Sequence, residues 1–206
     1  MKRDNTAPQL LYITDSSRTG QERLLEVVRI GLQHGVDGVL LREPTLNSGK
    51  LLALASTLRE LTRQHHAQLI IHSQADIARA VSADGVHLSS TAIDEAPAMR
   101  RWLAPLALTI SASCHQAAEL KQAALAGIDY ALLSPLFTTA SHPKATALGA
   151  NRFTALATQS PIPVLALGGI NPDNRNQVPS SAHGVAVMRG LDEAAHITDA
   201  ADLLLG

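Results

Sequence analysis

A regular alternation of short apolar segments with longer amphipathic segments constrains the fold of this chain more than any other feature. The apolar segments are rich in Leu, Ile, Val and Ala, and they recur about every 25 residues along the 206-residue chain. The apolar residues in each segment are consecutive and do not alternate with polar residues, which is typical of strands buried on both faces of a parallel sheet. The pattern predicts eight strands, at residues 10–14, 38–42, 68–72, 85–88, 108–112, 130–134, 163–167 and 184–188.

Helical patterns lie between these predicted strands. In the first of them, Leu24, Val28 and Leu32 belong to an apolar stripe along one face, as expected for a helix that packs on a sheet. The predicted helices cover residues 20–34, 47–65, 74–81, 95–103, 116–126, 152–158 and 193–205. Eight strands that alternate with helices predict an α/β fold, a single (β/α)8 TIM barrel that forms one domain over residues 1–206.

A doubly wound open sheet is the alternative architecture. Such sheets more typically have roughly five to seven strands, and they often carry a Gly-rich loop after the first strand. The segment after the first predicted strand, Thr14–Arg18, contains no glycine. The barrel is therefore the favoured prediction.

Composition and charge exclude several functional classes. A single Cys excludes a disulfide framework and a multi-cysteine metal site. The balance of 17 basic against 18 acidic residues, with 2% aromatic residues, argues against nucleic acid as a partner. The chain contains no run of about 18 apolar residues, so the sequence predicts no membrane span. The first residues, Met1–Asn5, are basic and then acidic with no apolar stretch behind them, so we expect a cytoplasmic protein.

Two glycine-containing segments predict a phosphate site. In TIM barrels, functional residues lie at the C-terminal ends of the strands, and phosphate is often bound by the loops after strands seven and eight. Gly168 and Gly169 follow the seventh predicted strand, and Met188, Arg189 and Gly190 follow the eighth. Glycine lets backbone N–H groups approach an anion closely. The alternative is that both segments are ordinary tight turns.

Arg42 and three histidines are the candidate catalytic residues. Arg42 ends the second predicted strand, where its guanidinium could hold a carboxylate or a second phosphate, or pair with Glu43. His72, His115 and His142 follow other strands, and an imidazole can both donate and accept a proton near neutral pH.

Three other features near these residues admit structural explanations. His87 lies inside the fourth predicted strand and is expected to be a packed barrel residue. Cys114 neighbours His115, but adjacent strand residues point to opposite faces, so we expect a buried Cys and not a nucleophile. The long polar loop Thr138–Lys144 is either a lid over the site or a mobile surface connection.

The same strand ends carry few acidic residues. Asp15 and Glu43 are the acidic residues expected there, and the three histidines have no other carboxylate beside them. A catalytic metal site built on these histidines would need further ligands. We therefore predict no catalytic metal.

With these residues placed, the chain resembles the thiamine phosphate synthase/TenI superfamily over nearly its whole length. The fold of that family is a (β/α)8 barrel, and the resemblance implies a small phosphorylated thiazole as substrate, a role in thiamine biosynthesis and a homodimer. The matching stretches are LYITD, GVLLRE, LIIHSQADIARAVSADGVHL, ISASCH, DYALLSPLFTTASHP, PVLALGGINPDN and GVAVMRGL. The string ADGVHL, followed at suitable distances by GGI and GVAVM, is fairly specific as a set.

Departures from the synthase branch favour the other branch of this family. The synthase has a Lys where this chain has Pro44, and magnesium-binding carboxylates where it has Ser73 and the Ser89–Ala92 stretch. The pyrophosphate-binding Lys of the synthase appears here as His142, although Thr139 and Ser141 match. A pyrophosphate leaving group needs cations to neutralise its developing charge. The resemblance therefore favours the thiazole tautomerase branch, which uses no metal.

The tautomerase branch aromatises a carboxythiazole phosphate by moving a proton. Its catalytic His lies in a Ser-x-His motif, which Ser113–His115 matches. The resemblance thus implies an isomerase without cofactor, in which His115 transfers the proton and Arg42 holds the carboxylate. The residues expected to bind substrate and phosphate are Ser134, Thr139, Ser141, Gly168, Gly169, Met188, Arg189 and Gly190.

Two other functions remain open from the sequence. One is a divergent thiamine phosphate synthase, which would join a pyrimidine diphosphate to thiazole phosphate with magnesium. The other is a non-catalytic binder of thiamine-related phosphates, because Ser141–Pro143 resembles relatives that are joined to Nudix hydrolases. The roles of His72 and His142 are not assigned.

Overall fold

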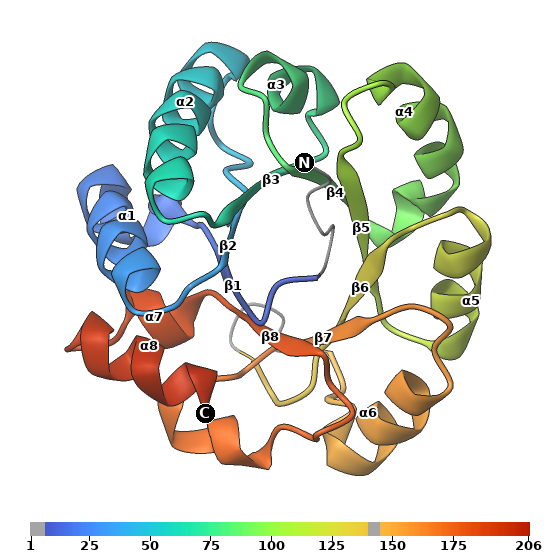
Figure 1. The fold of residues 1–206 in the computed structure, drawn as a ribbon. Coiled ribbons are helices and arrows are strands. Elements are labelled where there is room, and N and C mark those ends of the chain that lie inside the picture. The colour runs from blue at the N-terminus through green and yellow to red at the C-terminus, as the bar shows by residue number, and fades with distance from the viewer. Residues whose placement is uncertain (1–6, 140–144) are drawn as a thin grey trace.

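The chain forms a closed barrel of parallel strands in sequence order, β1 to β8, as a computed structural model shows for residues 7–139 and 145–206. Figure 1 looks along the barrel axis, with the strands in a ring and the helices around it. This confirms the predicted (β/α)8 TIM barrel and excludes the open sheet. The strands are β1 (Leu10–Ile13), β2 (Gly38–Leu41), β3 (Gln68–His72), β4 (Gly85–Leu88), β5 (Thr109–Cys114), β6 (Tyr130–Leu133), β7 (Val164–Leu167) and β8 (Gly184–Val187).

Helices cover the outside of the barrel because each presents an apolar stripe to it. They are α1 (Ser16–Gln33), α2 (Ser48–Gln64), α3 (Ala75–Ala80), α4 (Ala96–Leu103), α5 (Ala117–Leu125), α6 (Gly149–Thr158), α7 (Arg189–Asp192) and α8 (Ile197–Leu205), with 3-10 helices at Ser90–Glu95 and Pro172–Gln177. The first two helices begin differently. Asn47 caps α2 by accepting a hydrogen bond from the Lys50 backbone N–H, whereas α1 contains a break at Gly20, with φ of 82°. The observed helix therefore begins at Ser16, four residues before the predicted start at residue 20, because residues 16–19 form a turn of helix ahead of the apolar stripe.

The sequence predicts no helix between β7 and β8, whereas it predicts a last helix that begins earlier than the observed one. No α-helix covers the segment between β7 and β8; it contains only the 3-10 helix Pro172–Gln177, whose cap Asn171 exchanges hydrogen bonds with Asn174. The final predicted helix, 193–205, corresponds to α8, which begins only at Ile197, and the short helix α7 at Arg189–Asp192 lies before the predicted range. The sequence pattern missed α7 because its residues also form the loop that leaves β8.

Alternate residues of the strands build two apolar layers. One set fills the barrel interior and the other packs between the barrel and the helices, since successive strand residues point to opposite faces. Leu11, Leu40, Ile70 and Leu165 belong to the interior set. Beside them the interior is polar, because His87 on β4 and Ser111 on β5 are paired in register and buried. Among the described residues, none of the helices has the length and apolar character needed to cross a bilayer.

Candidate functional site

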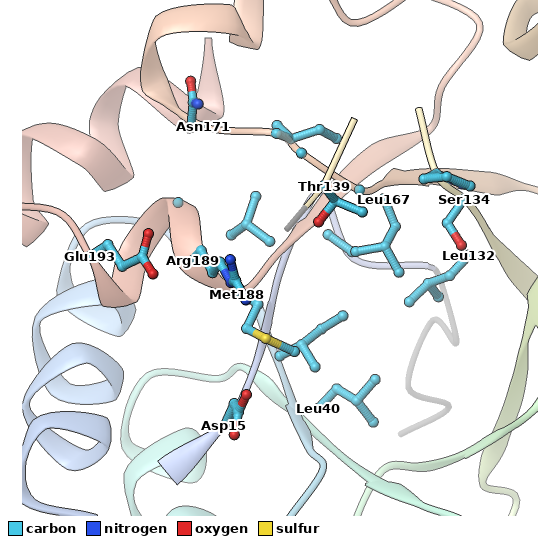
Figure 2. A pocket seen from close by; sticks show the side chains of 18 of the residues that line it. Asp15, Leu40, Leu132, Ser134, Thr139, Leu167, Asn171, Met188, Arg189 and Glu193 are labelled. Carbon is cyan, nitrogen blue, oxygen red and sulfur yellow. The ribbon is translucent and has the colours of Figure 1, made fainter. Parts of the chain in front are cut away.

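The C-terminal ends of the strands surround a cavity of about 1200 Å³. Every predicted site residue that the structure describes lines it: Arg42, His72, His115, Ser134, Thr139, Gly168, Gly169, Met188, Arg189 and Gly190. His142 and Ser141 lie outside the described residues. In Figure 2, Leu40, Leu132 and Leu167 point into the cavity with Met188, while Arg189 and Glu193 lie on one side of it and Ser134 on the other. The cavity therefore has an apolar floor and polar walls.

The loop after β7 approaches the β6 loop closely and needs glycine to do so. Gly168 and Gly169 have φ of 105° and 69°, and a Cβ on Gly169 would lie 2.5 Å from the carbonyl oxygen of Thr138. The Phe137 N–H donates to the Gly168 carbonyl at 2.9 Å, which fixes the two loops together. The close approach of the two loops therefore requires glycine at both positions.

Backbone N–H groups at the mouth are available to a ligand. In the described part of the chain, no group accepts a hydrogen bond from the N–H groups of Gly168, Gly169, Arg189 or Gly190. Unpaired backbone donors of this kind favour an anion. The Nε atom of Arg189 is also buried without a partner among the described residues. The arrangement is suited to bind a phosphate between the β7 and β8 loops.

His115 is held in one tautomer by a backbone carbonyl. Its Nδ1 lies 2.9 Å from the carbonyl oxygen of Ser134, and a carbonyl can only accept a hydrogen bond, so Nδ1 carries the proton. Its backbone N–H donates to the Glu119 carboxylate at 2.6 Å, which fixes the start of the loop. Nε2 of the neutral ring is then an acceptor in a residue that lines the cavity. This geometry is suited to a general base.

His87 and His72 form a second group of imidazoles at the mouth. The rings lie 5.8 Å apart, and His87 is hydrogen-bonded at 2.9 Å to both Ser111 and Ser113. Burial, with the His72 ring and the Arg42 guanidinium nearby, lowers the pKa of His87 to about 3. Burial and Arg42 also lower the pKa of His72. His87 is thus a neutral packed residue, as expected, and Arg42 is the fixed positive charge of this corner.

Arg42 does not pair with Glu43. The buried Glu43 carboxylate instead accepts hydrogen bonds from the backbone N–H and the hydroxyl of Ser16, at 3.0 and 2.6 Å. Among the residues described, no carboxylate forms an ion pair with the Arg42 guanidinium. A guanidinium in a cavity without an internal partner is suited to bind an anionic substituent of a substrate.

Cys114 is buried, as expected. Burial raises the pKa of its thiol to about 12, so it is a thiol at neutral pH and not a nucleophile.

None of the cavity-lining residues that follow β3 and β4 offers a carboxylate to a magnesium ion. Magnesium prefers carboxylate and other oxygen ligands. After β3 and β4, the residues that line or adjoin the cavity are Ser73, Ser89 and Ser90. The acidic residues that line the cavity come from other loops and from α8, and they are Asp15, Asp173, Glu193 and Asp199. Within residues 7–139 and 145–206, no three His, Cys, Asp or Glu side chains are grouped so that they could hold a metal.

Sequence reasoning missed Asp192, which lies directly behind the β8 loop. It is buried, and the Tyr12 hydroxyl on β1 donates a hydrogen bond to its Oδ1. Burial raises the pKa of Asp192 to about 6, with Asp15 and Glu193 adding to the rise while the Tyr12 hydrogen bond and Arg18 oppose it. The sequence offers no signal for it, because Asp192 lies between Leu191 and Glu193 in a short segment without hydrophobic periodicity.

The Asp192→Asn variant is expected to lose part of the pH dependence of stability. Because the folded-state pKa is raised from 3.8 to about 6, the folded protein keeps a proton that the unfolded chain has released. Stability of the wild type therefore falls as pH rises through this window, by roughly 3 kcal/mol for a two-unit shift, of which roughly 2 kcal/mol is lost between pH 4.5 and pH 7.5. Urea denaturation at pH 4.5 and pH 7.5 measures this. A wild-type-to-variant difference that is the same at both pH values would contradict it.

Comparisons with known proteins agree with the barrel and show its family. The sequence model of a family described as thiamine monophosphate synthase matches residues 10–191. A putative thiamine-phosphate synthase 2 of Aquifex aeolicus is 39% identical over 79% of this chain and 86% of its own length. The thiamine-phosphate synthase of Moorella thermoacetica is 34% identical over 93% and 91%. A thiamine phosphate pyrophosphorylase structure from Pyrococcus furiosus superposes with a TM-score of 0.83 at 31% identity, covering 95% of this chain and 93% of that one. The chain therefore belongs to the thiamine monophosphate synthase family.

Proposed function

We propose that this protein is a thiazole tautomerase of thiamine biosynthesis, an isomerase that aromatises a carboxythiazole phosphate. The observation that carries the proposal is His115, whose Nδ1–H is held by the Ser134 carbonyl and whose Nε2 is left as the acceptor. Histidine and serine, not carboxylates, follow β3, β4 and β5 at the mouth. This set of side chains favours proton transfer over the departure of a pyrophosphate.

Each part of the cavity has a role in this reaction. The N–H groups of Gly168, Gly169, Arg189 and Gly190 bind the phosphate, and Arg42 binds the carboxylate. The His115 Nε2 accepts the proton from the ring carbon beside the carboxylate. The electron pair moves through the ring to the exocyclic double bond, and the same proton is returned to the exocyclic carbon, so the product is the aromatic isomer. Ser134, whose carbonyl holds His115, and Thr139 also line the cavity.

Synthesis of thiamine phosphate is the second candidate function. It is favoured by the names of the relatives, since the Moorella thermoacetica and Methanospirillum hungatei proteins, at 34% and 33% identity, are both named thiamine-phosphate synthase. The magnesium-binding carboxylates of that branch are not at the corresponding positions here, and we derive no step of this reaction. A homodimer also stays a prediction of the family resemblance.

A single pair of assays separates these functions. Chelator-treated protein is expected to convert the exocyclic carboxythiazole phosphate into its aromatic isomer at the same rate as untreated protein, because the proposed acid–base group is an imidazole. The product is followed by ultraviolet absorbance and chromatography. The matched reaction contains the pyrimidine diphosphate, thiazole phosphate and magnesium, and is followed by pyrophosphate release.

The outcomes of the two assays differ for each function. Isomerisation that needs no metal supports the tautomerase. Pyrophosphate release without isomerisation would overturn it in favour of the synthase. Tight binding of the carboxythiazole phosphate without either reaction would identify a non-catalytic binder.

A further inference from the structure

The hydrogen bond between Tyr12 and Asp192 joins β1 to the short helix that follows the β8 loop. Both side chains are buried, with exposed fractions of 1% and 4%. The Tyr12 hydroxyl donates to Asp192 Oδ1, and Asp192 Oδ2 is buried without a hydrogen-bond partner among the described residues. Because a buried carboxylate with so few donors costs free energy, its single partner carries most of its stabilisation.

The same helix is fixed to its loop by backbone bonds. The N–H groups of Leu191 and Asp192 both donate to the Met188 carbonyl at 3.2 Å. On the far side, Arg23 of α1 donates to the carbonyl of Ala194 at 2.8 Å. The position of the Asp192 side chain is therefore transmitted to Met188 through one turn of helix.

The loop after β8 also contacts the loop after β7. A Cβ on Gly190 would lie 2.8 Å from the Ile170 carbonyl oxygen, so these two backbones are in close contact. In Figure 1, α7 lies beside α1 and next to the end of β8. A displacement of α7 would therefore move Arg189 and Gly190 relative to Gly168 and Gly169.

We propose that Tyr12 and Asp192 are positioning residues that hold the β8 loop in the geometry that binds phosphate. Neither residue is among those that line the cavity, so neither touches the substrate. The pair acts through Met188, Arg189 and Gly190. This inference rests on the phosphate site of the proposed function and adds to it the group that fixes its shape.

The test combines phosphate affinity with amide hydrogen exchange. Inorganic phosphate is titrated by calorimetry into the wild type, Tyr12→Phe, Asp192→Ala and Asp192→Asn. Tyr12→Phe and Asp192→Ala are expected to weaken phosphate binding by about tenfold or more, since a hydrogen bond to a charged group is lost. Asp192→Asn keeps an acceptor for the Tyr12 hydroxyl and is expected to stay within about twofold. Exchange at residues 188–191 is expected to speed up in the first two variants only.

Tyr130→Phe is the matched control, because it also removes one hydroxyl from a tyrosine that is 1% exposed, but on β6. It is expected to change neither readout. In substrate assays, Tyr12→Phe is expected to raise KM with little change in kcat, which a general loss of folding would not produce.

Two results would overturn different parts of the argument. Unchanged exchange and unchanged phosphate affinity in Tyr12→Phe would overturn the positioning role. Faster exchange at residues 188–191 in Tyr12→Phe, combined with a wild type that binds no phosphate, would instead overturn the proposed phosphate site.

Discussion

The His115→Ala variant is expected to lose about two to four orders of magnitude in kcat for isomerisation, the range of general acid–base catalysis by a positioned side chain. The reason is geometric. The Ser134 carbonyl holds Nδ1–H at 2.9 Å, so Nε2 of the neutral ring is the acceptor in a residue that lines the cavity. KM should change little, because phosphate and carboxylate are bound by other groups.

The measurement is the steady-state rate of aromatic product with each variant. His65→Ala is a suitable control, because His65 is exposed at the end of α2, remote from the mouth. It is expected to behave as the wild type. A His115→Ala variant with the wild-type rate would show that the proton is moved by another group, and His72, which lines the same cavity, would be the next residue to replace.

The barrel itself was predictable from the sequence because its strands are buried on both faces. Continuous apolar segments such as Leu69–Ile71 favour a covered parallel sheet, and eight of them close into a barrel. The elements that the pattern missed carry little periodicity. The four residues of α7 and the 3-10 helix Pro172–Gln177 are fixed by capping and by contacts of their loops, which a hydrophobic pattern does not record.

The candidate site was predictable in position and not in chemistry. Strand ends placed Arg42, His72 and His115 around one mouth, and the cavity contains all three. The tautomer of His115, in contrast, depends on a carbonyl 19 residues away along the chain. The partner of Asp192 is Tyr12, which is 180 residues away. The first pair arises because β5 and β6 are neighbours, and the second because β1 and β8 close the barrel, so neither is visible in a hydrophobic pattern.

The Gly169→Ala variant is expected to weaken phosphate binding by about two orders of magnitude, the loss expected when two hydrogen bonds to a charged ligand are removed. The added Cβ would lie 2.5 Å from the Thr138 carbonyl oxygen and 2.9 Å from the Phe137 Cβ. The β7 loop must then move away from the β6 loop, and the N–H groups of Gly168 and Gly169 move with it. Calorimetric titration with inorganic phosphate measures the effect.

Gly127→Ala separates this displacement from simple backbone strain. Gly127 has φ of 75°, close to the 69° of Gly169, but a Cβ there meets no atom within 4 Å, and the residue lies in a helix-to-strand loop at the opposite end of the barrel. Both variants are expected to lose about 1 to 2 kcal/mol of stability because Ala is strained at positive φ, and Gly169→Ala is expected to lose more because its Cβ also meets the Thr138 carbonyl oxygen. Only Gly169→Ala should lose phosphate affinity. If both variants bound phosphate as the wild type does, the close approach of the β6 and β7 loops would not be what shapes the anion site, and the N–H groups after β8 would have to bind the phosphate without them.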